Sequence, residues 1–168
     1  MESMELELEI NSAQNLKEVG KISNTKVYAK VVLGNKWKTT PVDKKGKTNP
    51  TWKCTTRFIV MRNEETEGET GRLSIELYGK RMLRKDKFLG RVRVNVWELY
   101  RQRKDGESNI LSFPVEDGEG MLTISYIFHG AGAVVNGCTP RCTPSFIGKA
   151  CVGAVSLVAS CTALAQAT

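Results

Sequence analysis

Apolar and polar side chains alternate along most of the first 130 residues. Near the start, Met4, Leu6, Leu8 and Ile10 alternate with glutamates, and the same period of two returns at 27–33. Successive side chains of a strand point to opposite faces, so this period predicts strands with one buried face. The pattern predicts eight strands, at residues 4–10, 27–33, 36–40, 52–60, 73–77, 92–96, 111–115 and 122–128.

The breaks between these segments favour short connections and no long helix. Gly34 and Asn35 suit a two-residue hairpin turn. Residues 97–104 are expected to hold a short helical turn. Pro114 should place its strand near a sheet edge, because proline cannot donate a ladder hydrogen bond. Strands that each have one apolar face predict an all-β, eight-stranded antiparallel sandwich of two packed sheets.

Charge divides the chain into two parts. Its 168 residues carry 25 lysines and arginines against 18 aspartates and glutamates, a net charge of +7. Every acidic residue lies before residue 120, and 131–168 holds only Arg141 and Lys149 as charged residues. We therefore expect one domain over 1–130 and a flexible, low-complexity tail rich in Cys, Ala, Gly and Ser over 131–168. A basic balance favours polyanionic partners such as lipid headgroups, nucleic acid or acidic proteins.

The end of the tail, residues 150–168, contains no charged residue. A membrane-spanning helix needs about 20 mostly apolar residues, so this segment is barely long enough for an anchor. Two alternatives are a tail that lies on the membrane, palmitoylated at Cys138, Cys142 or Cys151, and a tail with no membrane role. At the other end, four of the first nine residues are glutamates, which excludes a secretory signal and predicts a cytoplasmic protein.

Two motifs stand in an order similar to that of C2 domains. Asn49-Pro50-Thr51-Trp52 opens an alternating strand, and Phe88-Leu89-Gly90 follows a charged loop. The closing segment GMLTISYIF resembles the last strand of small plant C2 proteins of the SRC2-like and BON-associated kind. The resemblance covers residues 4–128 and implies the circularly permuted, type II strand order. It also implies a module that binds membranes, in signalling or in stress or defence responses.

Many C2 domains bind Ca²⁺ through aspartates in two loops at one end, and the resemblance locates those positions in this chain. Ca²⁺ takes about six to eight oxygen ligands, mostly from carboxylates. The positions of the family's aspartates fall on Lys26, Gly79, Arg81 and Lys87. Glu18 and Asp86 are the weak metal candidates that remain nearby. We therefore expect no Ca²⁺ site and no cofactor.

The loop before the sixth predicted strand is strongly basic. Residues 80–93 carry seven bases against Asp86, with Met82 and Leu83 among them. Cations can meet lipid phosphates while an apolar pair enters the headgroup region, so we expect this loop to contact an anionic phospholipid membrane. The alternative is a solvated loop with Leu83 folded inward. The lipid-binding residues predicted here are Lys26, Lys80, Arg81, Met82, Leu83, Arg84, Lys85 and Lys87.

A second set of cations takes the polar phase of three successive predicted strands. These residues are Lys30, Lys36, Lys38, Lys53 and Arg57. If the three strands are neighbours, the cations share one sheet face. The family resemblance then implies a lysine-rich groove for a phosphoinositide, whose closely spaced phosphates clustered cations can bind together. Ordinary solubilising lysines are the alternative.

Other functions find less support in the sequence. Single-stranded nucleic acid needs exposed aromatic rings for stacking, and Trp37, Trp52 and Phe58 are expected to point inward. His129 is the only histidine and lies past the last predicted strand, so no enzyme is predicted. The predicted function is therefore Ca²⁺-independent binding of anionic phospholipid, as a peripheral protein at the cytoplasmic face of a membrane. The alternative is a protein–protein interaction scaffold that partners a membrane protein.

Overall fold

The computed structural model describes residues 2–18, 26–62 and 71–130. The tail over 131–168, with every expectation placed on it, lies outside the described residues. The elements are β1 (Glu2–Gln14), β2 (Lys26–Leu33), β3 (Lys36–Thr39), β4 (Thr51–Arg62), β5 (Arg72–Lys80), β6 (Lys87–Asn95), α2 (Val96–Gln102), β7 (Asn109–Pro114) and β8 (Met121–His129). All eight predicted strands and the short helical turn are confirmed.

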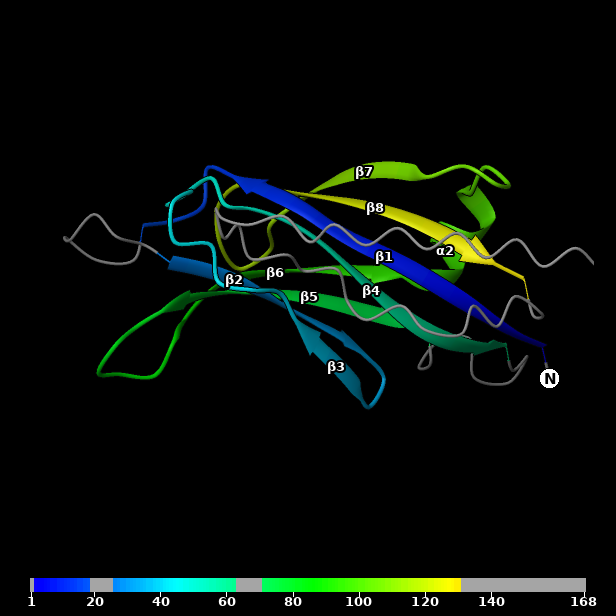
Figure 1. The fold of residues 1–168 in the computed structure, drawn as a ribbon, viewed down its shortest axis with the longest axis horizontal. Helices are drawn as coiled ribbons and strands as arrows, with labels where there is room; N and C mark the ends of the chain where they lie inside the picture. The colour runs from blue at the N-terminus through cyan, green and yellow to red at the C-terminus, as the bar shows by residue number, and fades with distance from the viewer. Residues whose placement is uncertain (1, 19–25, 63–70, 131–168) are drawn as a thin grey trace, which may run out of the picture.

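The strands form two four-stranded antiparallel sheets that pack face to face (Figure 1). Sheet A has the order β4-β1-β8-β7, and sheet B has the order β3-β2-β5-β6. The first and last strands are neighbours in sheet A, as the type II order requires. β7, which ends at Pro114, is an edge strand as predicted. The all-β sandwich expected from the alternating pattern is confirmed.

The core lies between the sheets and consists of the apolar phase of each strand. Leu6, Leu8 and Ile10 of β1 have no exposed surface, and Ile75 and Leu77 of β5, in the other sheet, are equally buried. Burial of apolar surface contributes about 25 cal/mol per Å², which makes these rows the main source of stability. Within the part of the chain that the structure describes, no helix is long and apolar enough to cross a membrane.

Strand direction brings several loops together at one end of the sandwich, here called the loop end. It carries the connections over 40–50, 81–86 and 115–120, and lies at the left of Figure 1. The opposite end carries the β2–β3 hairpin turn and α2. In that hairpin only Gly34 takes the positive φ, of 58°, so the turn depends on glycine rather than on Asn35.

The predicted facing of β3 is wrong. Lys38 lies opposite Val31 and Lys36 lies opposite Leu33, both buried residues of β2, so the two lysines take the inward phase. Trp37, predicted to point inward, takes the outer face and is 63% exposed. The reason is that all four residues of this edge strand are exposed, so alternation there does not report which face is buried.

Gly90 provides a test of the packing at the loop end. Its φ is +146°, and a Cβ atom would meet the side chain of Val115 and, at 2.8 Å, the carbonyl oxygen of Glu116. We expect Gly90→Ala to lower the free energy of unfolding by about 3 kcal/mol, because it adds crowding to backbone strain. Gly106→Ala is the control, since its φ is +77° with open space around it, and should cost about 1 kcal/mol. Urea unfolding of both variants measures the difference; equal losses would contradict the crowding at Gly90.

Candidate functional site at the loop end

A row of residues on neighbouring strands sets the position of two basic loops. Val27 of β2 lies opposite Gly79 of β5, and Gly79 lies opposite Lys87 of β6. On the other side, Asp43 extends the row through two hydrogen bonds with Val27, of 3.1 and 2.8 Å. Adjacent strands lie about 4.8 Å apart, so the row spans only about 15 Å. The loop over 43–50 and the loop over 80–87 therefore leave the same end of sheet B, on either side of β2.

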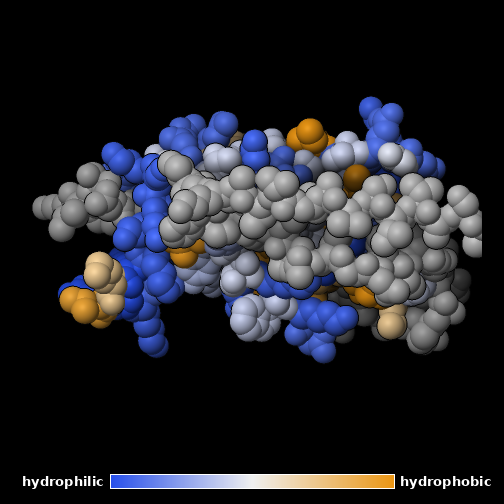
Figure 2. Space-filling model, in the orientation of Figure 1, coloured by the Kyte–Doolittle hydropathy of each residue, from blue (hydrophilic) through white to orange (hydrophobic). Residues whose placement is uncertain are grey.

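The loop over 80–87 presents its apolar pair to solvent. Met82 is 92% exposed and Leu83 is 96% exposed, so the alternative in which Leu83 folds inward is wrong. Figure 2 shows an apolar patch at the left end, next to hydrophilic residues, where this loop projects in Figure 1. The five cations around the pair are Lys80, Arg81, Arg84, Lys85 and Lys87.

Asp86, the one acid of this loop, organises it from within. Its Oδ1 accepts a hydrogen bond of 3.1 Å from the backbone N–H of Arg81. Its Oδ2 accepts bonds from the Tyr28 hydroxyl at 2.9 Å and from the Lys80 ammonium at 3.2 Å. The Arg81 N–H, together with Tyr28 and Lys80, lowers the pKa of Asp86. The carboxylate is thus engaged by three donors of the protein itself.

Tyr28 is the counterpart of Asp86 on β2. Burial, followed by the hydrogen bond and the charge of Asp86, raises the pKa of Tyr28 to about 12. Its ring stacks on that of Tyr78 with centroids 5.6 Å apart. The Lys80 ammonium lies 5.9 Å from the centre of the Tyr28 ring, in cation–π range. These contacts connect the loop to the outer face of sheet B.

The loop over 43–50 adds three cations that the sequence analysis did not assign. The Asp43 side chain accepts backbone N–H bonds from Lys45, Gly46 and Thr51, at 2.8, 3.1 and 2.8 Å. Burial opposes ionisation of Asp43, but the three backbone bonds and the Lys45 charge outweigh it and lower its pKa. The folded loop leaves Lys44, Lys45 and Lys47 exposed. The lysine run is visible in the sequence, but its place at the same end of sheet B as 80–87 follows only from the strand order.

We call this combined surface the basic tip. It comprises Lys26, Lys44, Lys45, Lys47, Lys80, Arg81, Met82, Leu83, Arg84, Lys85 and Lys87. Lys26 lies directly opposite Lys80 on the neighbouring strand. Like charges in that position repel each other. The basic tip therefore concentrates positive charge at one end of the molecule, around two exposed apolar side chains.

The five cations of the predicted groove do not share one sheet face. Lys30 is on the outer face of sheet B, with its Nζ 5.5 Å from the centre of the Trp37 ring. Lys36 and Lys38 lie at the edge of that sheet, on the inward phase. Lys38 donates to the carbonyl oxygen of Arg57 at 3.0 Å and lies over the Phe58 ring.

Lys53 and Arg57 belong to the other sheet. β4 follows β3 in the chain but pairs with β1 in sheet A, so the three strands assumed to be neighbours are not. Arg57 is engaged by glutamates of β1, with its Nη2 2.7 Å from Glu7 and its Nη1 3.8 Å from Glu5. The five cations are therefore divided between the two sheets and do not line a single groove.

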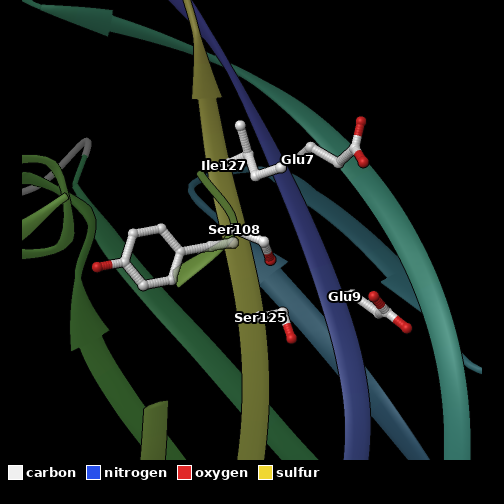
Figure 3. Close-up of a pocket in the computed structure, with 6 residues that line it drawn as sticks. Glu7, Glu9, Ser108, Ser125 and Ile127 are labelled. Atoms are coloured by element: carbon white, nitrogen blue, oxygen red, sulfur yellow. The ribbon is translucent and has the colours of Figure 1, made fainter. Parts of the chain in front are cut away.

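A shallow hollow on the outer side of sheet A offers little room for a small ligand. It is lined by Glu7, Glu9, Ser108, Ser125, Tyr126 and Ile127 (Figure 3). Its volume of about 90 Å³ is well below the several hundred Å³ of typical ligand pockets. His129 is nearby, with its Nε2 3.5 Å from a Glu7 oxygen. This hollow does not provide the enclosed site that catalysis on a small substrate needs.

The model of the C2 domain family matches residues 4–111, most of the described part of the chain. This chain belongs to the C2 domain family. It is 32% identical over 137 residues to a protein from Arabidopsis thaliana named Protein SRC2 homolog. That alignment covers 76% of this chain and 41% of the relative, so this chain spans less than half the relative's length.

Solved structures support the fold. A C2 domain of plant Extended Synaptotagmin 1 superposes with a TM-score of 0.63 at 15% identity, over 76% of this chain and 95% of that domain. Human GIVD cytosolic phospholipase A2 superposes with a TM-score of 0.61 at 14% identity, over 77% of this chain but only 18% of that enzyme. The family match and the SRC2 homolog favour a non-catalytic module.

The candidate metal residues of this C2 domain do not form a carboxylate cluster. In the described ranges there is no group of three or more His, Cys, Asp or Glu side chains that could hold a metal ion. Glu18 is exposed at the end of the segment that follows β1. Asp86 is engaged by Tyr28, Lys80 and the Arg81 backbone. The cation nearest to the Asp86 carboxylate is thus the Lys80 ammonium.

The contact between Tyr28 and Asp86 predicts how the Tyr28 hydroxyl titrates. Between pH 10 and 12 the native Tyr28 keeps a proton that the unfolded chain has lost, so its contribution to stability falls as pH rises through that window. Asp86→Asn removes the neighbouring negative charge and should lower the Tyr28 pKa toward, but not to, 10.0, because burial remains. NMR titration of ¹³Cζ-labelled tyrosine measures it. Asp117→Asn, which removes a carboxylate bonded to Arg91, is the control and should leave Tyr28 unchanged. A wild-type Tyr28 that titrates like a free tyrosine would contradict the contact.

Proposed function

We propose that this C2 domain binds anionic phospholipid membranes through the basic tip. The observation that carries the proposal is the almost complete exposure of Met82 and Leu83 in a loop of cations. Two adjacent apolar side chains held out in water are costly unless a less polar phase receives them. The interfacial layer of a membrane can accept such side chains while its phosphates meet the surrounding lysines and arginines.

The energetics favour binding by many weak contacts. A lysine or arginine near an anionic leaflet contributes about 1 kcal/mol. The basic tip has nine cations on β2 and on the loops to either side of it, and Asp86 is already paired with Lys80. A lipid phosphate between Lys26 and Lys80 would also relieve their mutual repulsion. This pair is where we place a phosphoinositide headgroup, whose phosphates are closely spaced.

The cations of the predicted groove have a smaller part in this proposal. Lys30, Lys36 and Lys38 lie along the β3 side of the sandwich and Lys53 lies on β4, so they act only as peripheral charges. Arg57 makes ion pairs with Glu5 and Glu7, which leaves its charge largely compensated. The proposal also includes a peripheral location on a cytoplasmic membrane face and a role in signalling, in stress or defence responses.

Independence from Ca²⁺ belongs to the same proposal. Lys26, Arg81 and Lys87 stand where the family resemblance places carboxylates. The loop is closed by hydrogen bonds from Lys80, Tyr28 and the Arg81 backbone to Asp86, so it needs no metal ion to hold its shape. A dication would have to displace the Lys80 ammonium and approach several fixed positive charges.

The apolar pair provides the sharpest test of membrane binding. Met82→Ser with Leu83→Ser should reduce binding to vesicles of phosphatidylcholine and phosphatidylserine at least about tenfold, since both side chains lose their insertion energy. Ile110→Ser is the matched control, because Ile110 is 65% exposed on the edge strand β7, which begins at the opposite end. Co-sedimentation measures binding. Equal binding of all three proteins would refute insertion of the pair.

The cations predict charge and salt dependence without a calcium requirement. Lys44→Glu with Lys45→Glu should weaken vesicle binding at least about tenfold, and Lys104→Glu, near α2, should not. Binding should fall steeply with salt, since exposed charges are screened beyond about 8 Å at physiological ionic strength. EGTA should leave it unchanged. A clear binding isotherm for micromolar Ca²⁺ in calorimetry would contradict calcium independence. It would not contradict membrane binding.

A further inference from the structure

The open edge of sheet B lies along β3. Within the described residues, β3 pairs with β2 alone. The N–H of Thr40 donates to the carbonyl oxygen of Ala29 at 2.9 Å, just past the strand. Bonded and non-bonded pairs alternate in an antiparallel ladder, so Lys38 and Lys36 turn their backbone groups to β2. The N–H and C=O groups of Trp37 and Thr39 therefore point outward, away from the sheet.

The side chains at this edge differ between the two faces of the strand. On the outer face Trp37 is 63% exposed, an unusual position for so large an aromatic ring, and the Lys30 ammonium lies 5.5 Å from the ring centre. On the other face lie Lys36 and Lys38, which form no ion pair with any residue that the structure describes. The Lys38 ammonium donates one hydrogen bond to the Arg57 carbonyl oxygen and keeps two further N–H donors. An added strand would meet an aromatic surface on one side and two positive charges on the other.

Each of the other described edges carries an obstruction at one position. At β4 the Lys38 ammonium already binds the outward carbonyl oxygen of Arg57. At β7 Pro114 lacks an N–H group, and β6 is covered at Arg91 by a two-bond bridge with Glu116. Proteins commonly block sheet edges in these ways. The lysines on the short strand β3 also discourage pairing with an incoming strand that is neutral or basic. They do not discourage pairing with an acidic strand.

We propose that β3 binds an extended acidic peptide segment of another protein by strand addition. Its backbone pairs with the free groups of Trp37 and Thr39, its carboxylates face Lys36 and Lys38, and an apolar side chain covers Trp37. A tryptophan between lysines also suits a membrane surface. However, the register places Trp37, with the Lys30 ammonium near its ring, on the face opposite to Lys36 and Lys38, which fits a two-faced strand better than a flat bilayer.

This site is separate from the basic tip. β3 begins at the β2–β3 hairpin, at the end of the sandwich opposite the loop end. A peptide at β3 and a membrane at the basic tip can therefore be bound together. Failure of one does not imply failure of the other, because they use different residues.

The test uses the full chain and fluorescent peptides in which valine alternates with glutamate or, as a control, with lysine. Anisotropy should show binding of the glutamate peptide only. Thr39→Pro removes one outward N–H at an edge where proline is tolerated and should weaken binding about fivefold, the factor for one net hydrogen bond. Lys36→Glu should weaken binding of the glutamate peptide more than Thr39→Pro does. Lys104→Glu, the matched charge control, should leave that binding unchanged. Thermal unfolding confirms that each variant is folded.

Two results would overturn the proposal. One is glutamate-peptide binding that is absent or unaffected by Thr39→Pro, which would exclude backbone pairing at β3. The other is a Trp37→Ala variant that loses affinity for phosphatidylserine vesicles but not for the peptide, which would make Trp37 a membrane contact. Protection of the Thr39 amide from hydrogen exchange by the peptide, with unchanged vesicle binding by Thr39→Pro, would support strand addition independently of the basic tip.

Discussion

The register of β1 is the constraint on which the rest of this molecule depends. β1 lies between β4 and β8, and its inward residues Leu6, Leu8 and Ile10 have no exposed surface. A slip of one residue against either neighbour would turn its glutamates into the core, so the pairing on both sides is fixed. Once sheet A is fixed, the sheet packed against it has its apolar rows fixed as well. The places where strands end, and hence where loops gather, follow from this burial.

The basic tip shows what that constraint makes possible. Lys26 and Lys80 are held opposite each other because Val27 and Gly79 must pair beside them, whatever the repulsion between the ammonium groups. Asp86 offsets part of that repulsion by binding Lys80. The core thus supplies the stability that allows one end of the domain to collect like charges. The free energy of such a surface falls when an anion approaches. A surface with balanced charges would show no such decrease.

The sequence predicts this fold well wherever a strand has one buried face, so period-two alternation locates β1, β2 and β5. It fails at Trp37, since an edge strand that overhangs the core has water on both faces and its alternation carries no direction. At Arg57 the alternation is right but the assumed neighbour is wrong, because strands that are consecutive in the chain need not be neighbours in a sheet. In the candidate site, the cations of 80–87 form one run and can be recognised from the sequence alone. The lysines that follow Asp43 gain their meaning only from its bridge to Val27, a tertiary contact that local composition does not encode.

Asp86 illustrates how a carboxylate in such a loop can serve a purpose other than binding a metal ion. A carboxylate that binds a dissociable metal ion makes loop geometry depend on the concentration of that ion. Here the bound cation is the ammonium of Lys80, attached covalently to the strand that enters the loop, so its effective concentration is constant. The loop shape is then fixed when the domain folds. On the proposed function, the variables that control membrane binding are the negative charge of the lipid surface and the ionic strength around it. The open edge of β3 is governed by a different variable, the availability of an acidic strand, so the two surfaces can respond to separate signals.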